Sequence, residues 1–576
     1  MENAPPPTAI RINRWLWVML LVAVVGAVFW PVLTFDFVRW DDDINVTQNP
    51  MMIAPWSWSL AGQFFESSTA LRFKPLHWLV FRIVAGWFDF NPVAWHGLNL
   101  VLHVAAGVLA FLVMRQVFAL AGAAPDSLAT NAWACAGAAW WALHPLRAEP
   151  VAWVTASTYP LTAVCLLGSF QAYLGAHRKT GVAPERCRLA VAWLLAVAAY
   201  ASYPIGAAYG LWLIAVDKCL LKIAPDRWLV LADPKTHRWW GKQALFLAPA
   251  VVALGFTVWS RITNPGIFVE APSLLSVDMG SRLWMALAAL AYFPLRLFWP
   301  TGLTPNMPPL QGGVLGNWHV PLLALTAVMA LLLMWRKRRA HPGLALVCFG
   351  FAILSLPCLG LTERPDWPVD RYSYLVDLII IGGLAGGGLA WSKGGRRKFA
   401  QVGGLAVMAG LLACAVLARR QIAIWRDTDS LFSHMEQAPG FADNPVQEGY
   451  IYFLWGRHAA ISAQPVRATR FFSQSQRVYR AAVEAAIKQG DYEGALKTLS
   501  HLEGRFGLTP ELRREKGAWL LRVSRPEEAL RELRAAGESL RDDARARALI
   551  DEAERALDAD RSRGGGEQAA GLAEPH

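Results

Sequence analysis

Apolar stretches of roughly 20 residues, each long enough to cross a lipid bilayer, recur through the first three quarters of this chain. Of its 576 residues, 55% are hydrophobic and 17% are charged, and the mean hydropathy is +0.30. This composition excludes an ordinary soluble globular protein. Because a lipid-exposed backbone must satisfy its own polar groups, each stretch is expected to be helical. The sequence therefore predicts an all-α polytopic membrane protein.

The first predicted span, 15–33, follows Arg11 and Arg14 and lacks a small-residue cleavage site, so we expect a retained anchor. The other expected spans are 96–118, 132–143, 150–174, 188–203, 205–221, 243–260, 320–335, 343–361, 374–391 and 399–418. The positive-inside rule makes the basic loops cytoplasmic, namely 177–188, 218–242, 336–339 and 393–398. Alternation then requires 283–299, which contains Pro294 and Arg296, to be a re-entrant or half-spanning segment. The result is about eleven full spans with a cytoplasmic amino terminus and an external carboxyl terminus.

Three adjacent carboxylates, Asp41, Asp42 and Asp43, lie just outside the first span. Such a cluster raises the free energy of ionising each member, so it favours a role with a cation, a bound proton or a substrate hydroxyl. The alternative is a solvated acidic loop. The segment 76–88 is apolar but too short to cross, which predicts an interfacial helix. We expect residues 35–95 to form the floor of an active site.

After Arg419 the composition changes to a soluble pattern rich in Ala, Glu and Arg. The domain prediction is a transmembrane unit at 1–418, a helical unit at 419–560 and a disordered tail at 561–576. Two similar segments, beginning at Gly490 and Ser524, are offset by 34 residues. This is the tetratricopeptide period and predicts a short α-helical solenoid that presents a surface to partners. A plain helical bundle is the alternative.

Several short motifs, in their order and separation, resemble the transmembrane and tetratricopeptide repeat-containing proteins of the GT-C glycosyltransferase superfamily, which are similar to protein O-mannosyltransferases. The matching stretches are Phe37-Val38-Arg39-Trp40-Asp41-Asp42 with Asn49-Pro50, Phe73-Lys74-Pro75-Leu76, Asn91-Pro92, Leu143-His144-Pro145-Leu146-Arg147-Ala148-Glu149-Pro150-Val151-Ala152-Trp153, Asp370-Arg371-Tyr372-Ser373-Tyr374-Leu375 and Trp425-Arg426-Asp427. The chain departs from the family pattern at Val376 and at Ser202-Tyr203-Pro204, where relatives carry Pro and Ser-Lys-Glu.

The resemblance implies a GT-C bundle that takes a sugar from a polyprenyl phosphate on the extracytoplasmic side. It also implies that a carboxylate of the first external loop acts as general base. Alignment from Asn49-Pro50 assigns this role to Asp41, with Asp42 orienting the acceptor or a cation, and leaves Asp43 as a solvated acid.

The leaving phosphate needs positive charge where its negative charge develops. Arg371 is the first candidate, because its planar fork can hold two phosphate oxygens, and Lys74 is the second. Either cation could instead neutralise the Asp cluster.

His144, Glu149 and Tyr372 form a candidate acceptor or ion site at the same end of the bundle. The alternative for His144 and Glu149 is a helix-turn lock, bracketed by Pro145 and Pro150, in which Glu149 pairs with Arg147.

His96, Asn99 and His103 share one helical face, but the two histidines are about 10 Å apart along the axis, which favours interhelical hydrogen bonds over a metal site. No metal ligand set is predicted and no cofactor is certain. An acidic cluster beside a phosphate could nevertheless recruit Mg²⁺ or Mn²⁺.

The favoured function is transfer of mannose or another hexose from a polyprenyl phosphate to Ser or Thr hydroxyls of exported proteins. The expected partners are the lipid-linked donor, the protein acceptor, the bilayer and a protein bound to the repeats, and nucleic acid is not expected. The expected location is a bacterial inner membrane with the repeats in the periplasm. The alternatives are a GT-C enzyme acting on a lipid or surface polysaccharide, and a non-catalytic membrane scaffold that presents its repeats.

Overall fold

The structure is a computed structural model that describes residues 13–66, 73–177, 184–226, 228, 233–263, 278–305, 317–361, 369–392, 397–536 and 543–570. Within these ranges every regular element is a helix. The chain divides into two compact units, Met1–Pro439 and Gly440–His576, and each is described by itself.

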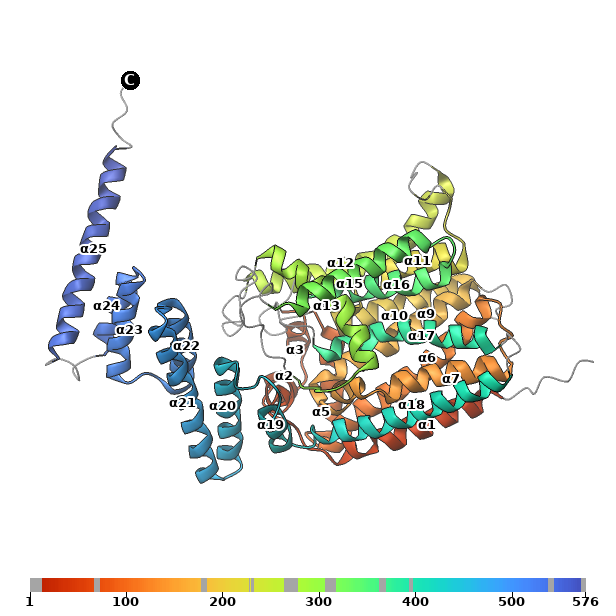
Figure 1. The fold of residues 1–576 in the computed structure, drawn as a ribbon, viewed down its shortest axis with the longest axis horizontal. Coiled ribbons are helices and arrows are strands. Elements are labelled where there is room, and N and C mark those ends of the chain that lie inside the picture. The colour runs from red at the N-terminus through yellow and green to blue at the C-terminus, as the bar shows by residue number, and fades with distance from the viewer. Residues whose placement is uncertain are drawn as a thin grey trace, which may run out of the picture. The chain divides into compact units, whose positions relative to one another are not determined.

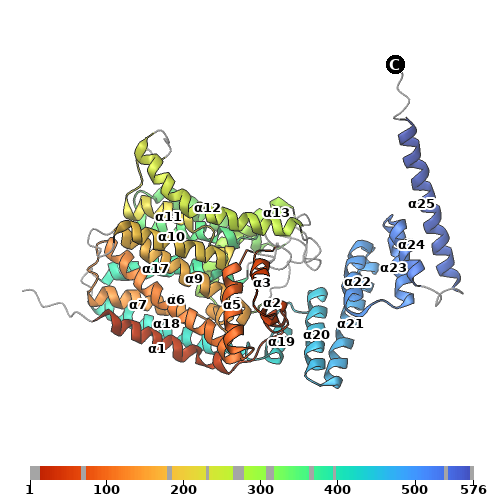
Figure 2. The same cartoon turned by 180° about the vertical axis from the view of Figure 1, so that it is seen from behind.

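Most helices of the first unit coincide with the apolar stretches that the sequence predicts, but the single span expected at 150–174 is broken near Trp153, where the axis bends by 104°. These helices are α1 (Arg14–Phe29), α6 (Pro92–Leu120), α7 (Leu128–Leu143), α9 (Thr158–Ala176), α10 (Glu185–Ser202), α11 (Tyr209–Val216), α12 (Pro234–Thr263), α13 (Met279–Phe298), α15 (His319–Lys337), α16 (Pro342–Ser355), α17 (Ser373–Ser392) and α18 (Arg397–Ala423). The long helices run side by side in one bundle (Figure 1), and the view from behind shows the same arrangement (Figure 2). Outward residues such as Leu405, Met408 and Leu412 of α18 are exposed, as a lipid-facing surface requires.

Fewer helices satisfy the requirements for crossing a membrane than the eleven spans that the sequence predicts. Among the described residues, seven helices are long and apolar enough, or eight if one bent pair counts as a single span. The 16 residues of α7 and the 14 residues of α16 reach only about 24 Å and 21 Å at 1.5 Å per residue, short of a typical hydrocarbon core.

Both ends of α13 meet the same end of the bundle. An Arg282 guanidinium N–H near its start donates to the Leu361 carbonyl beyond α16 (3.4 Å), and the Leu297 carbonyl near its end is 2.9 Å from His144 Nε2 beyond α7. α13 is one unbroken helix of 20 residues and is not among the helices that qualify as spans, so this arrangement fits a segment that does not cross the bundle rather than one that enters it and turns back.

The first external segment contains η1 (Trp30–Thr34), the π-helical turn η2 (Asp43–Thr47), α2 (Pro50–Ile53), α3 (Trp58–Gln63) and α5 (Pro75–Phe88). The helix expected at 76–88 is α5. The segment has a hydrophobic core of its own that includes Val46, Met51, Trp78, Phe81 and Trp95. The core also includes Val154 of η4 (Val154–Ser157), and Trp95 belongs to α6, so the segment is folded and packed onto the bundle rather than a loose loop.

The second unit consists of α20 (Pro445–Ile461), α21 (Pro465–Lys488), α22 (Tyr492–Phe506), α23 (Pro510–Arg522), α24 (Pro526–Ala535) and α25 (Ala544–Ala570). Consecutive helices pack as pairs, and Ala495 and Ala529 of the repeated segments are fully buried. These small side chains let neighbouring helices approach closely. The tetratricopeptide assignment stays a prediction.

The compositional change at Arg419 lies inside α18, and α19 (Thr428–Glu436) still belongs to the first unit. The chain therefore divides about 20 residues later than the predicted boundary at 418. Residues 561–570, which we expected to be disordered, continue α25, and the three consecutive glycines at 564–566 give no local reason for a helix there. Residues 571–576 of the predicted tail lie outside the described residues.

Two adjacent glycines of α17 test the packing of the bundle. A Cβ atom on Gly388 would lie 2.4 Å from the Trp133 ring of α7, whereas one on Gly387 would meet nothing within 4 Å. Overpacking of this kind costs about 1–3 kcal/mol, so Gly388→Ala should lower the thermal unfolding midpoint of the purified protein in detergent. Gly387→Ala is the matched control and should leave the midpoint unchanged or raise it. Equal midpoints for the two variants would show that α7 and α17 do not pack as described.

Candidate active site

A sharp break between two helices organises one end of the bundle, the end that the sequence predicts to be external. After α7 the chain forms the turn η3 (Pro145–Arg147), the short helix α8 (Ala148–Ala152) and the turn η4 (Val154–Ser157) before α9 begins. The helix axis bends by 104° between the two halves of this pair. Residues 144–158 are named here the break segment. Their side chains contact Asp42, the Trp40 carbonyl and Arg371.

Asp42 joins the first external loop to the break segment. Its carboxylate is fully buried and accepts three hydrogen bonds, from Val38 N (3.1 Å), Thr155 N (3.0 Å) and Thr155 Oγ1 (2.7 Å). Burial raises the pKa of Asp42 from 3.8 to about 7, although these donors oppose the shift. The geometry makes Asp42 an anchor of the loop.

The other two carboxylates of the cluster have different surroundings. Asp43 begins the turn η2, which directs it inward, and its Oδ2 lies 3.6 Å from Arg39 Nη1. It is therefore buried and paired, and the expectation of a solvated acid was wrong. Asp41 is the exposed member, and its φ of 71° lies in the left-handed region that non-glycine residues rarely adopt. A backbone of this kind persists where its surroundings impose it, which often occurs at functional sites.

Trp153, at the bend itself, links four elements. Its indole N–H donates to the carbonyl of Trp40, the residue before Asp41 (2.7 Å), and its ring stacks on Trp425 beyond α18 at 5.6 Å. Its own carbonyl accepts from Asn99 Nδ2 of α6 (2.8 Å). These contacts fix the position of the backbone at Asp41 relative to the bundle.

Arg371 pairs with Glu149 of the break segment. Its Nη1 donates to Glu149 Oε1 (2.7 Å) and to the Pro305 carbonyl (3.3 Å), and its Nε donates to Tyr159 Oη (3.2 Å). The guanidinium also lies 5.4 Å from the Trp153 ring centroid. The sequence alternatives in which Glu149 pairs with Arg147, or Arg371 neutralises the Asp cluster, are therefore wrong.

Two further buried ion pairs were not predicted. Arg147 Nη2 donates to Asp377 Oδ2, and both side chains are fully buried. Asp370 accepts from Arg296 Nε (2.9 Å) and Nη2 (2.8 Å) of α13 and from Tyr292 Oη (2.8 Å). The sequence signal for both was a lone cation within an apolar stretch, a costly arrangement unless a partner is near.

The remaining predicted site residues lie at different places. His144 is buried, and its two ring nitrogens contact the Leu297 carbonyl and the Leu146 N–H (3.3 Å), which supports the role of a turn lock. Tyr372 is close to the pair, because its ring lies 6.4 Å from Tyr159. Lys74 lies over the Trp78 ring (4.1 Å) at the start of α5, and no contact described here joins it to Arg371.

The polar face of α6 makes hydrogen bonds to other elements, as predicted. His96 contacts the Asp36 carbonyl (3.3 Å), Asn99 donates to Trp153, and His103 lies 2.7 Å from Tyr374 Oη and 3.0 Å from the Ala142 carbonyl. Among the described residues, no group of three or more His, Cys, Asp or Glu side chains has the arrangement of a metal site.

A small cleft of about 10 Å³ opens beside the Glu149–Arg371 pair. Its lining comes from the break segment, the segment after α13, Asp370 and the end of α18, and comprises Pro145, Leu146, Glu149, Leu303, Thr304, Pro305, Asp370, Gln421 and Trp425. Trp425 in turn stacks on Trp153, which holds Trp40. Asp41, Glu149 and Arg371 are thus brought to one region by the same segment.

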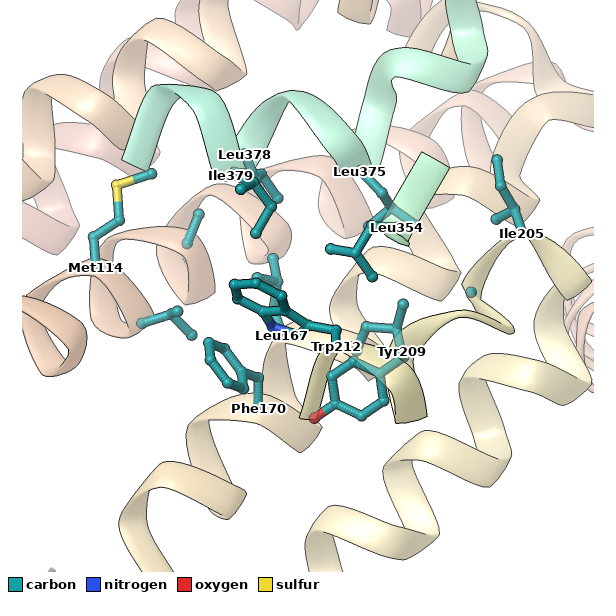
Figure 3. Close-up of a pocket in the computed structure, with 14 residues that line it drawn as sticks. Met114, Leu167, Phe170, Ile205, Tyr209, Trp212, Leu354, Leu375, Leu378 and Ile379 are labelled. Carbon is teal, nitrogen blue, oxygen red and sulfur yellow. The ribbon is translucent and has the colours of Figure 1, made fainter. Parts of the chain in front are cut away.

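An apolar cavity of about 100 Å³ lies among α6, α9, α11, α16 and α17. Figure 3 shows Leu375, Leu378 and Ile379 projecting from α17 toward Trp212, with Phe170 and Tyr209 nearby. The cavity begins close to the polar site: Leu375 is about one helical turn beyond Arg371, and Ile205 follows Tyr203, whose ring lies 5.4 Å from Tyr159.

No protein-family model matches the chain, and no curated protein matches it. Among solved structures, the chain is similar to the crystal structure of ArnT from Cupriavidus metallidurans bound to undecaprenyl phosphate. The two chains are 15% identical, the match covers 90% of this chain and 79% of that chain, and the TM-score is 0.34. A TM-score this low supports no conclusion about fold or function.

The titration of Asp42 gives a pH-dependent prediction. Since its pKa is raised from 3.8 to about 7, Asp42 is protonated in the folded protein and ionised in the unfolded chain between these pH values. Folding then takes up a proton, so the contribution of Asp42 to the free energy of unfolding falls as the pH rises through this window. Asp42→Asn cannot titrate and should flatten this part of the profile, measured as the unfolding midpoint against pH. Parallel profiles for the native chain and the variant would contradict the assignment.

Proposed function

We propose that this chain is a membrane-embedded glycosyltransferase that transfers a hexose, with mannose as the first candidate, from a polyprenyl phosphate to Ser or Thr hydroxyls of exported proteins. The observation that carries the proposal is the environment of Asp41. It is the exposed member of three carboxylates and has a left-handed backbone. The carbonyl of the preceding Trp40 accepts from Trp153, whose ring lies 5.4 Å from the Arg371 guanidinium.

Asp41 is the general base. Its carboxylate accepts the proton of the acceptor hydroxyl while the hydroxyl oxygen forms a bond to the anomeric carbon of the sugar. The bond between that carbon and the phosphate oxygen breaks, and the lipid phosphate leaves with the electron pair. A positioned base of this kind contributes about 10²- to 10⁴-fold to the rate. Asp42, which is buried and fully engaged with Val38 and Thr155, positions Asp41 rather than orienting the acceptor.

Arg371 binds the phosphate of the donor. Glu149 and Tyr159 orient its guanidinium, and its side chain keeps 19% of its surface exposed. The ion pair compensates the charge of this largely buried arginine before the donor binds, because an uncompensated buried charge would be costly. The positive charge is then in place as negative charge develops on the leaving phosphate. Lys74 remains the second candidate for this role.

The apolar cavity accommodates the isoprenoid part of the donor. Its lining is dominated by aliphatic and aromatic side chains, and it begins within about one helical turn of Arg371. An isoprenoid chain gains free energy by leaving water for such a lining, while its phosphate stays at the polar end. The polar and apolar sites therefore match the two chemical parts of one lipid-linked donor.

Asp41→Asn should abolish transfer while leaving the fold intact, because Asn also tolerates a left-handed backbone and Asp41 is exposed. Glycopeptides and intact masses of exported proteins should be compared in cells that lack the gene and carry either chain at equal level. We expect hexose-bearing peptides with the native chain and a loss of about 10²-fold or more with the variant.

Asp89→Asn is the matched control, because Asp89 is also an exposed aspartate with a positive φ, at the end of α5. It should restore glycopeptides fully. Restoration by Asp41→Asn as well would show that Asp41 is not the base. If the native chain itself restores no glycopeptide, the acceptor is not a protein, and surface glycolipids or a scaffold role would replace this assignment.

Filling the cavity should discriminate between donors. Ile379→Trp places a larger side chain in the cavity, so KM for a long polyprenyl donor should rise while KM for a short isoprenoid donor changes little. Leu384→Trp is the control, because Leu384 lies on the same helix and is exposed. An equal effect of Ile379→Trp on both donors would remove the cavity from the donor site.

A further inference from the structure

The hairpin of α20 and α21 in the second unit differs in charge from the helices that follow it. Residues 449–483 contain five arginines and no Asp or Glu. In contrast, the cations of α22–α25 are interleaved with acids, as in the pairs Arg513–Glu532 (2.8 Å) and Lys516–Glu503 (2.6 Å). The first hairpin is therefore a local concentration of positive charge in a unit with balanced charge elsewhere.

The tip of the same hairpin is apolar. Among the described residues of the second unit, the exposed large aliphatic side chains are Ile461 at 58% and Val466 at 83%. They lie on either side of the short turn between α20 and α21. Exposing two apolar side chains to water at one point is unfavourable in free energy, and a surface that covered them would remove this penalty.

The apolar tip and the cations are aligned on each helix. Arg457 precedes Ile461 by four residues on α20, and Val466 is followed by Arg470 and Arg477 at four and eleven residues on α21. These spacings place each set on one helical face. On α21 this face is opposite the one that Ala468, Phe471, Ser475, Tyr479 and Val483 bury. The first arginine on each helix lies about 6 Å from the apolar residue at the tip.

We propose that this hairpin tip binds the surface of an anionic phospholipid bilayer. Ile461 and Val466 enter the boundary between headgroups and acyl chains, and Arg457, Arg470 and Arg477 contact the phosphates one or more turns away. The 6 Å offset suits this depth profile, because interfacial helices bury apolar side chains about 5–10 Å into that boundary. An acidic protein would match the charge but would give no reason for apolar residues at the outermost point.

The first unit is itself a membrane unit, and the second is covalently attached to it. The tip is therefore tethered near the bilayer, so its contact with lipid loses little further translational freedom. The inference goes beyond the proposed glycosyl transfer and does not depend on it.

The test places an environment-sensitive fluorophore at the tip of the full chain. Ser462→Cys is labelled in a chain whose exposed native cysteines are changed by Cys187→Ser and Cys219→Ser. The protein is reconstituted in nanodiscs of phosphatidylcholine alone or mixed with phosphatidylglycerol. We expect blue-shifted emission and quenching by a lipid-soluble quencher in the anionic nanodiscs, with reversal at high salt.

Arg470→Gln with Arg477→Gln should weaken this equilibrium about 25-fold, since each arginine near an anionic surface contributes about fivefold. Ile461→Ser with Val466→Ser should also abolish the shift. Arg531→Gln, an exposed arginine of α24, is the matched control and should change nothing. A probe that stays in water in both nanodiscs overturns the proposal, and so does equal quenching in neutral and anionic lipid.

Discussion

The external end of the bundle depends on the break between α8 and α9 at Trp153. A helix that bends by 104° gives up backbone hydrogen bonds, and at the edge of a membrane little water is available to replace them. Other elements make this compensation: Asn99 donates to the Trp153 carbonyl, and Thr155 donates to Asp42 through both its backbone and its side chain. The first external loop, α6 and the end of α18 are held in one arrangement because each contacts the break segment.

Buried charge sets how the helices align around this segment. Arg147 and Glu149, two residues apart, pair with Asp377 and Arg371, six residues apart on the neighbouring η9 and α17. Asp370, next to Arg371, pairs with Arg296 of α13. In surroundings of low polarity, a shift between α17 and the break segment would leave charges without partners at a cost of several kcal/mol. The position of Arg371 relative to Asp41 is therefore fixed by interactions on both sides of the site.

The sequence predicted most helices of the first unit, because an apolar stretch of membrane length favours a helix whatever lies elsewhere in the chain. It did not predict the break within 150–174 or the smaller number of helices that are long enough to span. It predicted the hydrogen-bonding face of α6, since the spacing of His96, Asn99 and His103 defines a face. It was wrong about Asp43 because the turn η2 directs this residue inward, toward Arg39 four positions earlier. The alternative that paired Glu149 with Arg147 was wrong because the actual partner lies far away in the sequence. Arg371 and Glu149 are separated by more than 200 positions, and no local pattern relates them.

The sequence by itself determined that the chain is helical, that it belongs in a membrane, and that three carboxylates follow its first span while basic loops separate several of the later ones. These properties follow from composition and periodicity, which act over neighbouring residues. Only the tertiary structure decided that Asp42 and Asp43 turn inward while Asp41 stays exposed, and that Arg371 lies between the cleft and the apolar cavity. Burial and pairing of charge depend on which distant segments meet, and that is settled by packing rather than by local sequence.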